Sequence, residues 1–166
     1  DNCATAIATI RNLQLGVKDE NIKEGVTKIK SIARLQEITS GKLKNICKNN
    51  RLYLDGSHNP LGAKALNEYL NTLNCNKHLI LGMMSNKNHE EYISYFNDIS
   101  SITTIDVPNQ PNAITGEELK KKLNKYPNVN YKKSIEEALN SLNTDKDDLI
   151  MMTGSLYLAG ELLNRN

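Results

Sequence analysis

Two short polar runs carry the side chains of this sequence that are best suited to chemistry. The first, Asp55-Gly-Ser-His-Asn-Pro60, supplies a carboxylate, a glycine that permits a tight turn and an imidazole. The second, Thr153-Gly-Ser-Leu-Tyr157, is rich in small residues and offers a serine hydroxyl. Each run follows an apolar, strand-like segment and precedes a helix-like one. Ligands in α/β proteins collect at such junctions, because the first N–H groups of the helix point outward there.

Three side chains in these runs each have two possible roles. The Asp55 carboxylate suits a ribose hydroxyl or a hydrated cation, and it suits equally well the free amides at a helix start. His58 can donate to an anion, although a bond to its own backbone is the simpler interpretation. Ser155 and the N–H groups beside it can bind a carboxylate, but serine is also a favoured N-cap. Spacing alone leaves the role of Asp55 open, and it favours hydrogen bonds to nearby backbone over ligand binding for His58 and Ser155.

Other catalytic and cofactor motifs are missing from the sequence. Neither G-x-G-x-x-G nor G-x-x-x-x-G-K-[ST] occurs, so neither a dinucleotide fingerprint nor a P-loop is present. The run around Ser57 lacks the G-x-S-x-G spacing of a nucleophile elbow. The three histidines lack metal-ligand spacing, and we expect His78 and His89 to occupy ordinary surface positions.

Composition predicts a cytoplasmic protein with one main domain and no nucleic-acid or membrane partner. The 21 basic and 19 acidic residues leave a formal net charge of +2, which is too small for an electrostatic nucleic-acid footprint. No stretch approaches the roughly 18 apolar residues that span a bilayer. Three cysteines, far apart and without a C-x-x-C pair, indicate free thiols in a reducing compartment.

The hydrophobic pattern predicts an α/β domain preceded by two helices. Helical periodicity covers residues 2–13 and 19–30, after which strand-like runs alternate with amphipathic stretches. This alternation predicts a layered, Rossmann-like fold with a mostly parallel sheet of about six strands and helices on both faces. Residues 40–50 are expected to form a loop or hairpin. The predicted strands are 35–39, 51–55, 77–84, 101–107, 129–132 and 148–153. The helices predicted after residue 50 are 59–73, 88–97, 115–125, 134–142 and 154–164.

Taken together, four segments resemble one protein family. They are Asp55-Gly-Ser-His-Asn-Pro60 with the following Leu-Gly-Ala-Lys-Ala-Leu, the run from Thr153 to Gly160, Gly82-Met-Met-Ser-Asn-Lys87, and Asn2-Cys-Ala-Thr-Ala. These motifs are similar to those in the carboxy-terminal domain of the folylpolyglutamate synthase and dihydrofolate synthase family, which belongs to the Mur-type ATP-dependent amide ligases. The resemblance covers nearly the whole chain.

The resemblance implies a ligase reaction that joins L-glutamate to a folate or a dihydropteroate. ATP phosphorylates the substrate carboxylate, and the amine of glutamate then attacks the acyl phosphate and displaces phosphate. The family requires Mg²⁺ with the nucleotide, and its carboxy-terminal domain closes over the nucleotide. By this resemblance, the residues that contact ATP are Asn2, Arg34 and Asp55. Those that face the glutamate or the inter-domain cleft, or support that surface, are His58, Asn59, Ser155 and Tyr157.

The resemblance also divides the chain into two parts. Residues 1–33 are expected to be a helical lead-in from the family's central ATPase domain, and residues 34–166 the glutamate ligase domain. The family usually has P-G-R-[LMF]-E before its first strand, whereas here Ala33 precedes Arg34. The P-loop and the Mg²⁺ ligands lie in an amino-terminal ATPase part that this chain does not contain. We therefore expect no metal ligands in this chain and no turnover by this chain alone.

A second hypothesis comes from a different class of function. The same residues are consistent with a non-catalytic α/β module that binds a nucleotide or a partner, or with a remnant of such a ligase. Nucleotide binding that is unaffected by Arg34→Ala or Asp55→Ala would favour this alternative.

Overall fold

The structure is a computed structural model that describes residues 2–166. The chain divides into two compact units, one that ends at Ile32 and one that spans Ala33–Asn166. The first unit holds two helices, α1 (Asn2–Asn12) and α2 (Asp19–Thr27), and none of their residues is buried. Both predicted helices are therefore present, while their origin in an ATPase domain stays a prediction.

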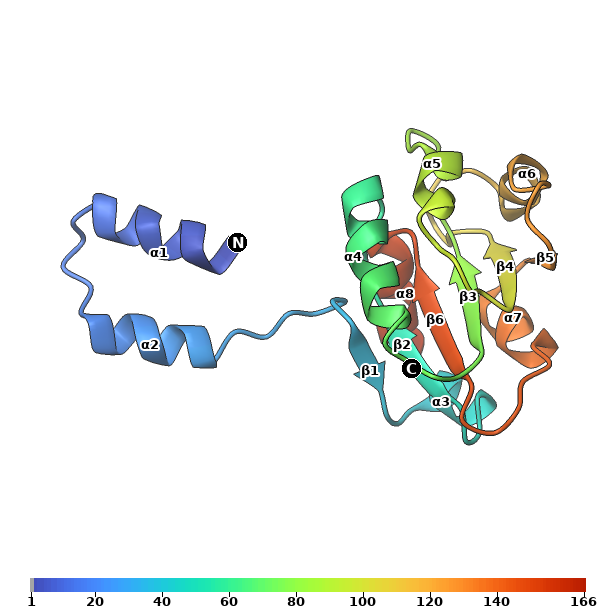
Figure 1. Ribbon diagram of the computed structural model, residues 1–166, viewed down its shortest axis with the longest axis horizontal. Coiled ribbons are helices and arrows are strands. Elements are labelled where there is room, and N and C mark those ends of the chain that lie inside the picture. Colours follow the sequence, from blue (N-terminus) through green and yellow to red (C-terminus); the bar gives the residue numbers. More distant parts are fainter. Residues whose placement is uncertain (1) are drawn as a thin grey trace. The chain divides into compact units, whose positions relative to one another are not determined.

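The second unit is built on one six-stranded sheet with the order β1-β2-β6-β3-β4-β5 (Figure 1). β1 pairs with β2 in the antiparallel sense, and every other neighbouring pair is parallel. The predicted fold class, a mostly parallel α/β sheet of about six strands, is thus confirmed. The strands are β1 (Gln36–Ile38), β2 (Arg51–Leu54), β3 (Lys77–Leu81), β4 (Ser101–Ile105), β5 (Val129–Lys132) and β6 (Leu149–Thr153).

Helices cover both faces of this sheet, each over its own apolar cluster. Helices α4, α5 and α6 pack on one face, and α3, α7 and α8 on the other. Every residue of β3 and β6 is buried, as expected for central parallel strands covered on both sides. The bounds are α3 (Lys42–Ile46), α4 (Pro60–Leu70), α5 (His89–Ser94), α6 (Gly116–Lys122), α7 (Ile135–Ser141) and α8 (Leu156–Arg165). Within residues 2–166, no helix has both the length and the apolar character needed to cross a bilayer.

Residues 40–50, expected to be a loop or hairpin, contain the short helix α3. The two strands around it pair in the antiparallel sense, so the connection is a hairpin that includes one helical turn. The Asn166 side chain explains this turn, because its Oδ1 accepts hydrogen bonds from the Leu43 and Lys44 amides at 3.1 and 3.2 Å. A partner 122 residues away leaves no local sequence signal.

Candidate functional site

Both polar runs identified in the sequence lie at one edge of the sheet, where β2, β6 and β3 end. We call this the carboxyl edge. β2 and β6 are parallel neighbours, so Asp55 and Ser155 follow adjacent strand ends. The Gly154 amide donates to the Ser57 carbonyl at 3.0 Å, which ties the two junction loops directly together. The topology thus places the two runs side by side although about 100 residues separate them.

Asp55 holds the Arg34 segment against the turn after β2. Its Oδ2 accepts from the Leu35 amide at 2.9 Å, and its Oδ1 accepts from the Ser57 amide at 2.8 Å. The residue is only 6% exposed. Arg34 itself is exposed, and its guanidinium has no hydrogen-bond or ion-pair partner among the residues that the structure describes. The arrangement leaves the arginine fork available for an anionic ligand.

The backbone on both sides of Arg34 has positive φ angles, +54° at Ala33 and +45° at Leu35. Residues other than glycine adopt this left-handed conformation at a cost, and neighbouring structure must maintain it. Here the Ala33 carbonyl accepts from the Gly56 amide at 2.8 Å, and the Ala33 amide donates to Gln36 Oε1 at 2.9 Å. The alanine that departs from the family pattern therefore occupies a conformation that favours glycine.

The first pocket at the carboxyl edge, which we call the Asp55 pocket, has a volume of about 350 Å³. The polar side chains that line it come from the segment before β1 and from the loop between β2 and α4. They are Arg34, Asp55, Ser57, His58 and Asn59. Asn59 caps α4, since its Oδ1 accepts from the Gly62 amide at 2.9 Å. A guanidinium, a carboxylate and an imidazole thus line one small hollow.

The second pocket, which we call the Ser155 pocket, has a volume of about 510 Å³ and shares His58 with the first. Ser155 caps α8, because its Oγ accepts from the Tyr157 amide at 3.1 Å, and Tyr157 itself is largely exposed. His58 Nδ1 lies 3.0 Å from the Gly56 carbonyl. A carbonyl can only accept, so Nδ1 carries the proton and the neutral ring has a lone pair on Nε2.

Lys87 in the Ser155 pocket was missed among the predicted site residues. The half-buried lysine lines this pocket together with Ser85 and Asn112. The G-M-x-x-x-K motif contains it, so a signal was present in the sequence. Asn112 lies in the loop after β4, and no motif marks it.

A buried cluster of three hydroxyls supports both junction loops. The Tyr92 hydroxyl lies 3.0 Å from Ser57 Oγ and 2.8 Å from Thr153 Oγ1, and those two oxygens are 3.2 Å apart. Burial raises the pKa of Tyr92 to about 12, so the phenol keeps its proton at neutral pH. Tyr92 belongs to α5, and nothing in its local sequence shows that it reaches these loops.

The residues that the resemblance assigns to ATP come from both units of the chain. Asn2 belongs to the first unit and is exposed, whereas Arg34 and Asp55 of the second unit line one pocket. Within residues 2–166, no three acidic, histidine or cysteine side chains converge as metal ligands would. The described residues therefore offer no cluster of three such side chains for a Mg²⁺ ion.

The expectation that His78 and His89 are surface residues was wrong. They are 6% and 3% exposed. His89 Nε2 bonds to the Met84 carbonyl at 3.0 Å, and burial lowers the pKa of its imidazole. Residues at the start of a strand or helix can be buried by the loops that fold over them, which local sequence does not show.

Comparison with known proteins gives a family and a set of similar folds. The family model described as Mur ligase, glutamate ligase domain, matches residues 34–156. The bifunctional folylpolyglutamate synthase/dihydrofolate synthase of Yersinia pestis is similar over 97% of this chain, with 20% identity and a TM-score of 0.77. Folylpolyglutamate synthase of Thermotoga maritima is similar over 98%, with 24% identity and a TM-score of 0.70. The Mycobacterium tuberculosis folylpolyglutamate synthase complexed with ADP is similar over 89%, with 18% identity and a TM-score of 0.73.

These solved structures are much longer than the present chain. The similar region makes up 37%, 37% and 35% of the three proteins in the same order. No curated protein sequence matches this chain significantly. The family match covers well over half of the chain, and it coincides with the unit that carries both pockets. The chain belongs to the Mur ligase family, in its glutamate ligase domain.

Proposed function

We propose that this chain is the carboxy-terminal part of a cytoplasmic ATP-dependent ligase that adds L-glutamate to folate or dihydropteroate. One observation carries the proposal: the Asp55 and Ser155 pockets adjoin at the carboxyl edge and share His58. A reaction between a nucleotide, an amino acid and a carboxylate needs two such adjacent binding sites. The names of the similar structures, folylpolyglutamate synthases and a bifunctional dihydrofolate synthase, support this choice of substrates.

The Asp55 pocket suits the nucleotide. The Arg34 guanidinium has no partner among residues 2–166 and can pair with phosphate oxygens through two parallel hydrogen bonds. Asp55 already accepts two amides, and the remaining lone pairs of its carboxylate can accept from a ribose hydroxyl. The bond from the Leu35 amide also fixes the backbone beside Arg34, so Asp55 would act on the ligand and on the arginine together.

The Ser155 pocket suits L-glutamate. The Lys87 ammonium supplies positive charge for a carboxylate, and the Ser155 hydroxyl supplies a neutral hydrogen bond beside it. His58 and Tyr157 line the same pocket, and Asn59 supports His58 by fixing the start of α4. In the reaction, the glutamate amine forms the new C–N bond, loses a proton, and phosphate leaves the acyl carbon. This chain would orient the amine, while Mg²⁺ ligands and the phosphate loop belong to the amino-terminal ATPase part.

Calorimetric titration with ATP and with L-glutamate tests the proposal. Arg34→Ala should weaken ATP affinity about ten-fold, because it removes a charge-assisted bond, and should leave glutamate affinity unchanged. Lys87→Met should weaken glutamate affinity about ten-fold and leave ATP affinity unchanged. Addition of the amino-terminal part should strengthen both affinities and start turnover.

Lys120→Met is the matched control, because it removes an ammonium from an exposed position in α6, away from both pockets. The affinities for ATP and for L-glutamate should both stay unchanged in this variant. An ATP affinity that is unchanged in both Arg34→Ala and Asp55→Ala would favour the non-catalytic module instead. Phosphate release by the chain alone that requires glutamate and a folate would contradict the expected need for the ATPase part.

A further inference from the structure

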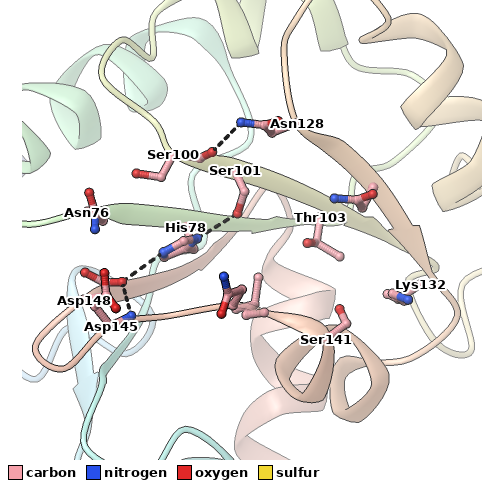
Figure 2. A pocket seen from close by; sticks show the side chains of 13 residues that line it. Asn76, His78, Ser100, Ser101, Thr103, Asn128, Lys132, Ser141, Asp145 and Asp148 are labelled. Atoms are coloured by element: carbon pink, nitrogen blue, oxygen red, sulfur yellow. Dashed lines mark hydrogen bonds and ion pairs between the residues drawn. The ribbon is translucent and has the colours of Figure 1, made fainter.

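A third pocket, lined mainly by polar side chains, lies at the opposite end of the sheet from the carboxyl edge. We call it the amino-edge pocket; its volume is about 570 Å³. The first residues of β3 and β4, the edge strand β5 and the segment between α7 and β6 surround it (Figure 2). This volume lies within the usual range of small-molecule sites. Nothing in the proposed ligase reaction uses this pocket.

The floor of the amino-edge pocket is polar where the sheet would normally be apolar. Side chains alternate along a strand, so His78 shares a face with Ile80, while Ser101 and Thr103 share that face with Ile105. Ile80 and Ile105 belong to the core cluster under α7 and α8. Because α7 ends at Ser141, the amino ends of the strands stay uncovered by a helix and form the floor.

A chain of hydrogen bonds orients this floor. Asp148 Oδ2 accepts from the Asp145 amide at 2.7 Å and lies 3.3 Å from His78 Nε2 (Figure 2). His78 Nδ1 lies 2.8 Å from Ser101 Oγ. A carboxylate accepts, so Nε2 carries the proton in neutral His78, and Nδ1 accepts from the Ser101 hydroxyl. The Ser101 oxygen then offers its lone pairs to the pocket.

Thr103 supplies an unused hydroxyl to the same floor. The residue is 2% exposed, yet its Oγ1 has no hydrogen-bond partner within residues 2–166. The neighbouring Thr104 points to the other face, and its hydroxyl bonds to the carbonyls of Gly116 at 2.7 Å and Asn130 at 3.1 Å. No side-chain oxygen or nitrogen among the described residues is both buried and unpaired, so the Thr103 hydroxyl is reachable from the pocket, where a ligand can pair with it.

The remaining lining identifies the class of ligand. It consists mainly of hydroxyl and carboxamide side chains, and His78 contributes the one ring among the lining residues. Lys132 lies at one end and the carboxylates of Asp145 and Asp148 at the other, so the positive and negative charges are separated across the pocket (Figure 2). Hydroxyls and amides each donate and accept, which matches the hydroxyls of a sugar. We propose that the amino-edge pocket binds a small, neutral, polyhydroxylated molecule of the sugar or polyol class.

Amide chemical-shift mapping of the chain with D-glucose and with maltose tests this proposal. At least one sugar should produce saturable shifts that gather at residues 76–78, 101–103 and 145–148. Thr103→Val keeps the shape and removes the unpaired hydroxyl, so sugar affinity should fall about ten-fold while the melting temperature stays level or rises. L-Glutamate and inorganic phosphate should leave these residues unshifted.

Thr104→Val is the matched control on the adjacent residue. It removes a hydroxyl with two partners, so the melting temperature should fall while sugar affinity stays unchanged. Absence of saturable shifts with both sugars would overturn the proposal. Unchanged sugar affinity in Thr103→Val, or phosphate shifts at the amino-edge pocket, would also overturn it. None of these outcomes depends on the ligase reaction, so the two proposals can fail separately.

Discussion

Cys47 shows how burial changes the chemistry of a single side chain in this protein. The residue is 4% exposed, and its thiol donates to the Leu43 carbonyl at 3.4 Å. Burial raises the pKa of the thiol to about 11, and the nearby Lys44 lowers it only in part. The thiolate is the reactive form of cysteine, so Cys47 is nearly inert at neutral pH. Cys3 and Cys75 are partly exposed.

A small disulfide reagent at pH 8 should therefore modify Cys3 and Cys75 well before Cys47. With a pKa near 11, roughly 0.1% of Cys47 is thiolate at this pH, against about a quarter of an ordinary cysteine. The rate at Cys47 should rise steadily as the pH approaches 11. Mass spectrometry of peptides at timed intervals measures all three rates, and equal rates at pH 8 would contradict the burial of Cys47.

Pocket-lining residues could be predicted from the sequence where a motif contained them, although Lys87 was missed within its motif. Asp55, His58 and Ser155 were found in the sequence, because two junction runs contain them. Tyr92 and Thr103 were not, since their roles depend on strands and helices distant in sequence. Whether a hydroxyl has a partner is decided by packing alone.

At the scale of elements, the turn between β6 and α8 depends on Gly154. Its φ is +103°, which residues other than glycine rarely adopt. A Cβ built there would lie 2.7 Å from Leu81 Cδ1 and 2.8 Å from the Gly82 carbonyl oxygen. The end of β3 lies so close that no side chain fits at position 154. The tight turn that results places Ser155 in its pocket.

Gly154→Ala should lower the free energy of unfolding by about 3 kcal/mol, from backbone strain and the clash together. Gly160→Ala is the matched control within α8, where no atom lies within 4 Å of the added Cβ. That change should raise stability by about 1 kcal/mol, because alanine is the better helix former. Urea unfolding of both variants checks the pair, and an equal effect of the two alanines would show that the turn tolerates a side chain.

Strand positions were predictable from sequence, but their ends were less so. The predicted strands 77–84 and 101–107 stop pairing at Leu81 and Ile105. Met83 and Val107 lie beyond these ends yet are buried in the two core clusters. The apolar pattern of a sequence shows which residues are buried, whereas a strand also requires a neighbouring strand to pair with. The apolar pattern therefore continues beyond the last paired residue of each strand.

At the scale of the whole molecule, the core formed by residues 2–166 lies in the second unit. Both apolar clusters consist of residues from Ala33 onward, and α1 and α2 contribute no buried residue. Burial of apolar surface is the main stabilising contribution to folding. The free energy of unfolding should therefore come from the unit Ala33–Asn166.

A protein shortened to begin at Ser31 should unfold in urea with the same free energy as the full chain, to within about 0.5 kcal/mol. Ser31 is exposed, and this start keeps Ala33 and its backbone bonds in place. Circular dichroism should show loss of helical signal from the removed segment only. A fall of more than about 2 kcal/mol would mean that the first unit stabilises the second.

Chemical-shift mapping of the chain with L-glutamate tests the central claim, that the two junction loops form one binding surface. The account predicts that shifted amides gather at residues 55–59, 85–87 and 153–157, around the Ser155 pocket and the shared His58. In Lys87→Met these shifts should saturate at about ten-fold higher L-glutamate concentration. Shifts confined to the amino-edge pocket, or no saturable shift at the carboxyl edge, would contradict it.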